Sequence, residues 1–353
     1  MLSFSPRPFS AASVVATPKG KVFVKRHHCS VRDLNGLLEE HRLIAHLAAV
    51  DEVGGSKRLV APVLADCDGK TAIADREWTY EVQPVAQGLD VYEDAVSWTP
   101  FLCGGHARSA GQALARLHQA AVGYDAQARK TQQLVSTFTI FADRSPMERM
   151  EIYMESRPRL RDYAEQRNWR ASFDEVLMPL QARLEPWLPY LKPLWTHNDL
   201  HASNLMWSGA GEDAEVLSVI DFGLADRTNA VHDIATAIER NIVEWLRMDE
   251  AGAEIVHIDH LDALLAGYEE ISPLSYEEAQ ALVAMLPLVH CEFALSETDY
   301  FLRILDSPEK AYLAYEGYFL AHARWFQTAQ GRRLLEYLEA WVKQRSGARG
   351  GER

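Results

Sequence analysis

Apolar and polar positions in the first part of the chain predict a β-hairpin. Two short apolar runs, Val14-Val15 and Val22-Phe23-Val24, flank the sequence Pro18-Lys19-Gly20. Branched and aromatic side chains favour extended backbone, and a Pro/Gly cluster between two such runs is typical of a turn. We therefore predict two short strands within residues 9–26.

The next segment changes to the spacing of an amphipathic helix. Ser30 with Asp33 is typical of a helix start. The apolar residues that follow recur at helical intervals, at Leu34, Leu37, Leu38, Ile44, Ala45 and Ala48. Further strand-like pieces come at 59–64, 70–74 and 78–82, separated by Asp/Gly turns. The pattern predicts a small sheet that carries one helix.

Helical periodicity dominates after Gly88. It covers residues 106–121, 125–193 and 231–343, and one strand-like stretch at 195–222 interrupts it. The sequence thus predicts an α+β fold with an N-terminal lobe at 1–84 and a mainly helical lobe at 85–345, joined by a hinge near 83–88. Residues 346–353, rich in Gly and Arg, are predicted to be a disordered tail.

Composition narrows the class of protein. The chain has 353 residues, of which 48% are hydrophobic, so it can bury a large core and is not a disordered or collagen-like protein. Its net charge of −14 disfavours binding to nucleic acid, which needs a basic face. Residues 1–38 differ, with six basic side chains against one acidic, which indicates either a basic surface or an anion site.

Cysteine usage and apolar runs indicate where the protein works. The four cysteines lie far apart and form no C-x-x-C pair, which argues against a zinc site and fits a reducing compartment. The best apolar run, 281–289, is too short to span a bilayer, and the N-terminus lacks the apolar core of a secretory signal. We expect a cytoplasmic protein that binds neither membranes nor nucleic acid.

The densest group of polar residues runs from Thr196 to Asn204 and leads into a predicted hairpin. Two apolar runs, 205–207 and 216–220, flank a polar turn, and Asp221 follows the second run. Because a hairpin brings its two ends together, Asn204 and Asp221 should be neighbours, with Asp199 on the same loop. An Asn and an Asp offer the hard oxygens that Mg²⁺ prefers, and Asp199 is a candidate base for phosphoryl transfer.

One alternative uses the histidines of the same loop. His197, Asp199 and His201 contain the residue types of a metal-dependent hydrolase site. That alternative leaves Asn204 and Asp221 unused. A P-loop nucleotide site is excluded, because no G-x-x-x-x-G-K-[ST] sequence is present.

The pattern H-x-D-x-x-x-x-N at 197–204, followed by D-F-G at 221–223, resembles the aminoglycoside phosphotransferase/choline kinase family. The segment Gly111 to His118 looks like that family's G-x-x-L-A-x-L-H helix. The chain departs from the usual pattern at Asn198, where the family commonly has glycine. The resemblance implies a bilobal protein-kinase-like fold that binds ATP, or GTP, with Mg²⁺. It also implies a catalytic base at Asp199, metal ligands at Asn204 and Asp221, and a structural role for Asp233.

The resemblance also implies residues that hold the nucleotide. Lys25 should contact the phosphates, and a glutamate from the following helix should pair with it; helix geometry favours Glu40 over Glu39, which points away from the apolar stripe. Backbone groups near Gln83 and Val85 are expected to bind the adenine. The short sequence 9–13 replaces a glycine-rich loop and makes Ser10 and Ser13 candidate phosphate contacts.

The acceptor is predicted only as a class. Within such a family it is a small molecule with a hydroxyl group, such as an antibiotic sugar, an amino alcohol, a homoserine-like compound or a sugar. A cationic acceptor could be met by acidic residues at 239, 244, 292, 297 and 299, or by aromatic side chains near the C-terminus, although core packing and solvated faces are the default for both sets. A stress-response type of protein Ser/Thr kinase and a nucleotide-binding module without catalysis stay open, as does the oligomeric state.

Overall fold

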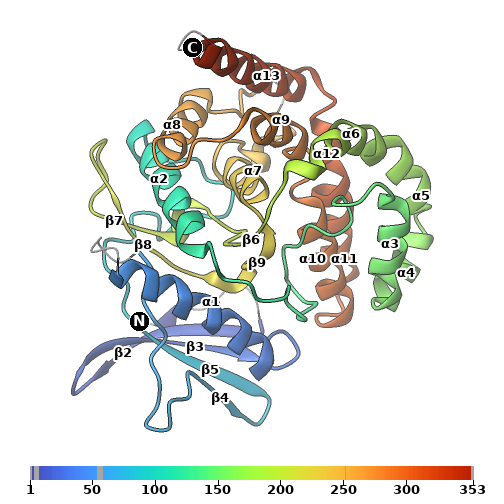
Figure 1. Ribbon diagram of the computed structural model, residues 1–353. Helices are drawn as coiled ribbons and strands as arrows, with labels where there is room; N and C mark the ends of the chain where they lie inside the picture. The colour runs from blue at the N-terminus through green and yellow to red at the C-terminus, as the bar shows by residue number, and fades with distance from the viewer. Residues whose placement is uncertain (1, 4–7, 54–58, 251, 351–353) are drawn as a thin grey trace.

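A five-stranded antiparallel sheet forms the N-terminal lobe of the computed structural model, which describes residues 2–3, 8–53, 59–250 and 252–350 (Figure 1). Its strands lie in the order β1 (Leu2–Ser3), β2 (Ser10–Thr17), β3 (Gly20–His28), β5 (Trp78–Pro84) and β4 (Ala72–Asp75). Strands β2 and β3 are the predicted hairpin, and β4 and β5 match the pieces predicted at 70–74 and 78–82.

One helix, α1 (Leu34–Val53), lies between this sheet and the rest of the molecule (Figure 1). The carboxylate of Asp33 accepts a hydrogen bond of 2.7 Å from the backbone N–H of Gly36, so Asp33 rather than Ser30 caps the helix. Residues 59–64, predicted as a strand, are irregular, and the Leu64 N–H donates a hydrogen bond to the Val82 carbonyl of β5.

The rest of the chain forms a mainly helical lobe (Figure 1). Its helices are α2 (Gly104–Ala121), α3 (Pro146–Glu155), α4 (Pro158–Glu165), α5 (Trp169–Ser172), α6 (Met178–Leu184), α7 (Ala230–Asn241), α8 (Ile258–Glu269), α9 (Tyr276–Met285), α10 (Cys291–Arg303), α11 (Pro308–Tyr312), α12 (Ala321–Trp325) and α13 (Ala329–Gly350). The fold is therefore the expected α+β arrangement of a small sheet lobe and a large helical lobe. Across the described residues, no helix has the length and apolar character needed to cross a lipid bilayer.

Two small sheets place the polar loops of the helical lobe. Strand β6 (Pro193–Thr196) pairs with β9 (Asp226–Asn229), and β7 (Leu205–Trp207) pairs with β8 (Val216–Val219). The loop between β6 and β7 and the turn after β8 both start and end on this paired backbone, so they are fixed relative to each other.

The structure corrects two sequence predictions about the helical lobe. Residues 122–145 contain no helix, although the pattern predicted one from 125, because the run Ser136-Thr137-Phe138-Thr139 consists of residues with low helix propensity. Helix α13 continues to Gly350, so most of the predicted disordered tail is helical, and residues 351–353 lie outside the described part.

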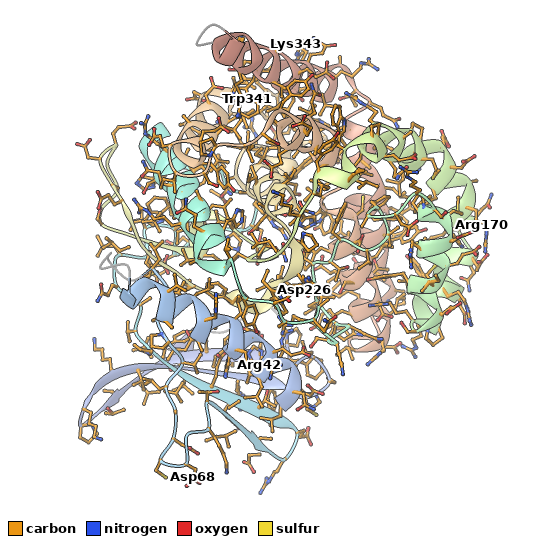
Figure 2. All side chains as sticks on the ribbon, viewed as in Figure 1. Arg42, Asp68, Arg170, Asp226, Trp341 and Lys343 are labelled. Atoms are coloured by element: carbon orange, nitrogen blue, oxygen red, sulfur yellow. The ribbon has the colours of Figure 1, made fainter. Side chains whose placement is uncertain are left out.

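In Figure 2, Asp226 lies in the interior of the molecule, whereas Arg170 lies at its edge.

Candidate active site

The loop after β6 is held in place by one buried carboxylate. Asp233 of α7 accepts hydrogen bonds from the backbone N–H groups of His197, at 2.9 Å, and Asn198, at 2.8 Å. His118, at the end of the Gly111–His118 motif, lies 3.1 Å from the same carboxylate. Burial by itself raises the pKa of Asp233, but the His118 hydrogen bond and the nearby imidazoles outweigh burial and lower it. Asp233 thus supports the loop, as predicted.

Asn198 occupies a left-handed backbone conformation, with φ of +59°. Glycine meets no steric penalty there, and Asn is one of the few other residues that adopt it readily. The Asn198 side-chain oxygen accepts hydrogen bonds from the hydroxyls of Thr196 and Thr228. These contacts hold Asn198 in the left-handed conformation, where the resemblance led us to expect glycine.

Asp199, the predicted base, lies beside a buried arginine. Its Oδ1 lies 3.3 Å from Nε of Arg240, and its backbone carbonyl accepts a 2.9 Å hydrogen bond from the amide of Asn204. Arg240 is 5% exposed, and its Nε also lies 3.7 Å from Glu239. The Asp199 side chain remains 20% exposed and faces a cavity.

The hairpin formed by β7 and β8 brings Asn204 and Asp221 together, as its pattern predicted. The Ile220 N–H donates a 3.0 Å hydrogen bond to the carbonyl of Asn204, directly before Asp221 in the chain. Asp221 itself has φ of +58°, a conformation that non-glycine residues adopt rarely and that often marks functional sites. The local backbone therefore aims a carboxylate and an amide at one place.

Lys25 of β3 reaches across to this place from the other lobe. Its Nζ lies 2.9 Å from Oδ1 of Asp221. Burial by itself lowers the pKa of Lys25, but the carboxylates of Asp221, Glu81 and Glu40 outweigh burial and raise it. The same ion pair holds the pKa of Asp221 well below its usual range. Both groups are therefore charged at neutral pH.

A single cavity of about 690 Å³ collects most of the predicted catalytic groups. Its lining includes Lys25, Asp199, Asn204, Asp221 and Ser10. The lining also includes Ala95, Val96, Ser97, Trp98 and Leu246. Charged and amide groups thus share one cavity with several apolar side chains.

The structure corrects the partner predicted for Glu40. As predicted, Glu40 of α1 points inward and is 3% exposed. Glu39 lies at the border of the buried face of this helix. The carboxylate of Glu40, however, lies 3.4 Å from Arg129 and 3.9 Å from Arg32, whereas Lys25 pairs with Asp221. Arg129 belongs to the irregular segment 122–145, which the sequence pattern had predicted as helix.

Of the remaining predicted nucleotide contacts, most are absent from the cavity lining. Ser10 and Ser13 are on strand β2 rather than in a loop, and only Ser10 lines the cavity. The side chain of Gln83 donates a 2.9 Å hydrogen bond to Glu81, and Val85 is 42% exposed. Neither Gln83 nor Val85 belongs to the cavity lining.

The metal-hydrolase alternative does not fit the loop geometry. Nε2 of His197 lies 3.0 Å from the Ile220 carbonyl, and its Nδ1 accepts a hydrogen bond from the Asp199 N–H, so both ring nitrogens have backbone partners. Within the described residues, the only trio of His, Cys, Asp or Glu placed to share an ion lies elsewhere in the helical lobe.

The acidic residues considered for a cationic acceptor are absent from the cavity lining. Three of them are buried and engaged by the protein itself: Glu292 by Thr137 and Thr139, Asp299 by Gln133, and Glu239 by Trp98. Glu244 pairs with His257 and Arg247. These carboxylates stabilise the helical lobe.

Sequence reasoning missed Arg240, Arg32 and Arg129. Its spacing from Asp233 could have indicated Arg240. Arg240 follows Asp233 by two helical turns, so the two residues lie on the same face of α7. Arg32 and Arg129 both donate to the carbonyl of Gly223, in the D-F-G sequence, and gave no such signal because their partners are distant in the chain.

The small sheet lobe, the helical lobe and the paired D-F-G and H-x-D-x-x-x-x-N loops together define a protein-kinase-like phosphotransferase fold. The family model described as "Phosphotransferase enzyme family" matches residues 9–274, and the chain belongs to this family. It is therefore an enzyme, a phosphotransferase with an alcohol group as acceptor.

Solved structures agree with this fold. The chain is similar to an aminoglycoside phosphotransferase from Alicyclobacillus acidocaldarius, at 16% identity and a TM-score of 0.50, over 98% of this chain and 92% of that one. It is also similar to a spectinomycin phosphotransferase solved with ADP and spectinomycin, at 11% identity and a TM-score of 0.50, over 93% and 88% of the two chains. The search of curated proteins gave no match.

Proposed function

We propose that this phosphotransferase moves the γ-phosphoryl group of ATP, with Mg²⁺, to a hydroxyl group of a small molecule. The observation that carries the proposal is the convergence of Lys25, Asp199, Asn204 and Asp221 on one cavity. Phosphoryl transfer needs a cation at the phosphates, oxygen ligands for the metal and a carboxylate beside the acceptor. GTP meets the same requirements, and the experiment below compares the two donors.

The charged and amide residues of the cavity suit a magnesium nucleotide. The amide nitrogen of Asn204 donates to the Asp199 carbonyl, so its amide oxygen is the atom offered to a cation. Asp221 adds a charged carboxylate that is 45% exposed, and such oxygens are the ligands that Mg²⁺ prefers. When bound, Mg²⁺ supplies neutralisation of the charge that develops between the β- and γ-phosphates. Lys25 binds the phosphates from the sheet side.

Asp199 is the proposed base. The acceptor hydroxyl donates a hydrogen bond to the Asp199 carboxylate, which orients its oxygen toward the γ-phosphorus. A bond forms between that oxygen and phosphorus as the bond to the β,γ-bridging oxygen breaks, and the nucleoside diphosphate leaves. The hydroxyl proton passes to Asp199 late in the transfer. Arg240, at 3.3 Å, keeps the carboxylate in this orientation.

The cavity favours a small acceptor over a protein. Its volume of about 690 Å³ falls in the range of about 300–1,000 Å³ that is typical of small-molecule sites. Trp98 and Leu246 belong to its lining and offer apolar surface to a small acceptor. Antibiotic sugars, amino alcohols, homoserine-like compounds and sugars are all candidate acceptors.

A turnover screen with magnesium and either ATP or GTP, run across panels of those four acceptor classes and a protein Ser/Thr substrate mixture, tests the proposal. We expect nucleoside diphosphate release that depends on one small acceptor and is abolished by Asp199→Asn. Asp199→Asn should keep the rise in melting temperature that magnesium nucleotide causes, and Asp221→Ala should lose it. Asp213→Asn, an exposed turn residue, is the matched control and should behave as wild type. Full activity of Asp199→Asn, or phosphate incorporation into protein alone, contradicts the proposal.

A further inference from the structure

A second group of metal-binding side chains lies in the helical lobe, outside the catalytic cavity lining. It consists of Glu239 from α7, His290 from the residue before α10, and His322 from α12. The three side chains are 2%, 6% and 5% exposed, respectively. They come from segments far apart in the sequence, and the fold brings them together in the buried interior.

The distances within this group fit an ion better than hydrogen bonds. Oε1 of Glu239 lies 3.5 Å from Nδ1 of His290 and 3.4 Å from Nδ1 of His322. Good N–H···O hydrogen bonds have a separation of about 2.9 Å. Two ligands of a tetrahedral ion with bonds of about 2.1 Å are about 3.4 Å apart. The Nδ1 atom of His322, although buried, has no hydrogen-bond partner in good geometry.

Neighbouring groups hold two of the three side chains in place. The indole N–H of Trp98 donates a 2.9 Å hydrogen bond to Oε1 of Glu239. The ring of Trp245 stacks on His322 at 4.0 Å between centroids. The outer partners of metal ligands typically include such hydrogen bonds, and an apolar shell that excludes water is common around them. Arg240, beside the other carboxylate oxygen, is the same residue that pairs with Asp199.

We propose that Glu239, His290 and His322 bind one divalent transition-metal ion of the Zn²⁺ type. Two imidazoles and one carboxylate are a ligand set that zinc accepts, with a fourth position left for water. Mg²⁺ prefers oxygen ligands, so this site and the site of Asn204 and Asp221 discriminate between the two ions. The ion ties α7, α10 and α12 together behind Trp98, which also lines the catalytic cavity.

The test uses the full-length protein after removal of metals with a chelator. We expect one equivalent of Zn²⁺ to bind in the presence of excess Mg²⁺ and to raise the melting temperature, and Co²⁺ to give the visible absorption of a four-coordinate site. Glu239→Gln, which keeps a partner for Trp98, and His322→Gln should each lower zinc affinity at least 100-fold. His260→Gln, a buried histidine outside the group, should bind zinc as wild type does.

Several results would overturn this inference. One is the absence of stoichiometric zinc uptake, and another is zinc binding that Glu239→Gln and His322→Gln leave unchanged. If both variants fail to fold, the Co²⁺ spectrum of the wild-type protein decides, because octahedral or absent absorption excludes the proposed site. None of these readouts depends on finding the phosphate acceptor, so the zinc site and the proposed reaction can fail independently.

Discussion

The ammonium group of Lys25 lies 2.9 Å from the carboxylate of Asp221, so a charged pair joins the sheet lobe to the helical lobe at the mouth of the catalytic hairpin. Each partner holds the other in its charged form, because their mutual attraction raises the pKa of Lys25 and lowers that of Asp221. In the proposed reaction a magnesium nucleotide would offer both groups new partners, phosphate oxygens for Lys25 and a metal ion for Asp221. The pair thus keeps two charged groups in position for one ligand.

This relationship predicts how Lys25→Met behaves. The variant should lose most of the nucleotide-induced rise in melting temperature and should have a higher KM for the nucleotide. Its matched control is Lys21→Met, which removes a lysine from the exposed end of the same strand and should bind nucleotide as wild type does. Thermal shift and steady-state kinetics measure both effects. Nucleotide binding by Lys25→Met that equals wild type would show that the lysine does not contact the phosphates.

Arg240 should affect the catalytic rate more strongly than it affects the binding of the nucleotide. Its guanidinium lies 3.3 Å from Asp199, and a base that is misplaced by about 1 Å can lose about 100-fold in rate. We therefore expect Arg240→Gln to lower kcat by about 100-fold while the KM for the nucleotide stays near its wild-type value. Arg247→Gln, whose side chain is 42% exposed, is the control. A change confined to nucleotide KM would refute the positioning role.

Glu40 should be far more important for stability than its neighbour Glu39. Glu40 compensates two buried guanidinium groups, those of Arg32 and Arg129, and loss of one partner from a buried ion pair costs about 3 kcal/mol or more. We expect Glu40→Gln to lower the free energy of unfolding by about 3 kcal/mol. Glu39→Gln, on a side chain that is 17% exposed and lies 4.0 Å from Nε of Arg129, should lower it by a smaller amount, because Glu40 still faces both guanidinium groups. Denaturant unfolding compares the two variants, and equal losses would contradict this account.

The sequence was informative where a pattern is local or a turn forces proximity. The β2–β3 hairpin follows from apolar runs around Pro18-Lys19-Gly20, and the approach of Asn204 to Asp221 follows from a hairpin of known ends. The buttress at Asp233 came through family resemblance and is confirmed by its two backbone hydrogen bonds.

The sequence could not show which distant charges would meet. Helical periodicity correctly predicted that Glu40 points inward. It could not predict that Glu40 would lie beside two arginines, one of which belongs to a segment with no regular structure. Likewise, no local pattern says that Glu239 would meet imidazoles from residues 290 and 322. Such contacts depend on how helices pack, and packing is decided by shape and burial across the whole core rather than by spacing along the chain.

Gly111 should be essential for packing, because helices α2 and α8 cross there at close range. A Cβ atom at Gly111 would lie 2.0 Å from the carbonyl oxygen of Leu264, whereas one at Gly104 would meet only Ala263 at 3.9 Å. Gly111→Ala therefore forces the helices apart and should lower the melting temperature by several degrees, since overpacking costs about 1–3 kcal/mol. Gly104→Ala should leave it unchanged or raise it slightly, because Ala favours helix. A Gly111→Ala variant as stable as wild type would indicate that α8 can shift freely.

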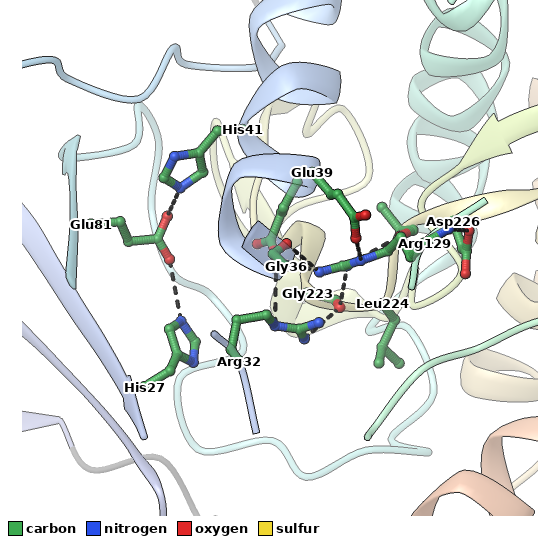
Figure 3. Close-up of polar contacts among 12 residues, drawn as sticks. His27, Arg32, Gly36, Glu39, His41, Glu81, Arg129, Gly223, Leu224 and Asp226 are labelled. Atoms are coloured by element: carbon green, nitrogen blue, oxygen red, sulfur yellow. Dashed lines mark hydrogen bonds and ion pairs between the residues drawn. The ribbon is translucent and has the colours of Figure 1, made fainter. Parts of the chain in front are cut away.

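Glu81 links stability to pH in the sheet lobe. It lies between His27, at 3.4 Å, and His41, at 3.0 Å, and is 1% exposed (Figure 3). Burial by itself raises the pKa of Glu81, but the hydrogen bonds of the two histidines and the charge of Lys25 outweigh burial and hold the pKa well below the usual value of 4.5. A carboxyl group with a lowered pKa stabilises the fold above its unfolded-state pKa, and this contribution is lost as pH falls through the folded-state pKa.

Glu81→Gln should therefore be less stable than wild type at pH 7, by about 1.5–3 kcal/mol, because hydrogen bonds to a charged group are replaced by neutral ones. The stability deficit of Glu81→Gln should narrow as pH falls below about 4.5. Below that pH the unfolded wild-type chain takes up a proton on Glu81 that the folded chain does not, so the wild-type protein loses stability. Glu77→Gln, on a side chain that is 68% exposed, removes a carboxylate beside His28 and should show no comparable deficit. Urea unfolding across this pH range measures both variants, and a Glu81→Gln deficit that stays constant with pH would mean that the charge of Glu81 does not stabilise the lobe.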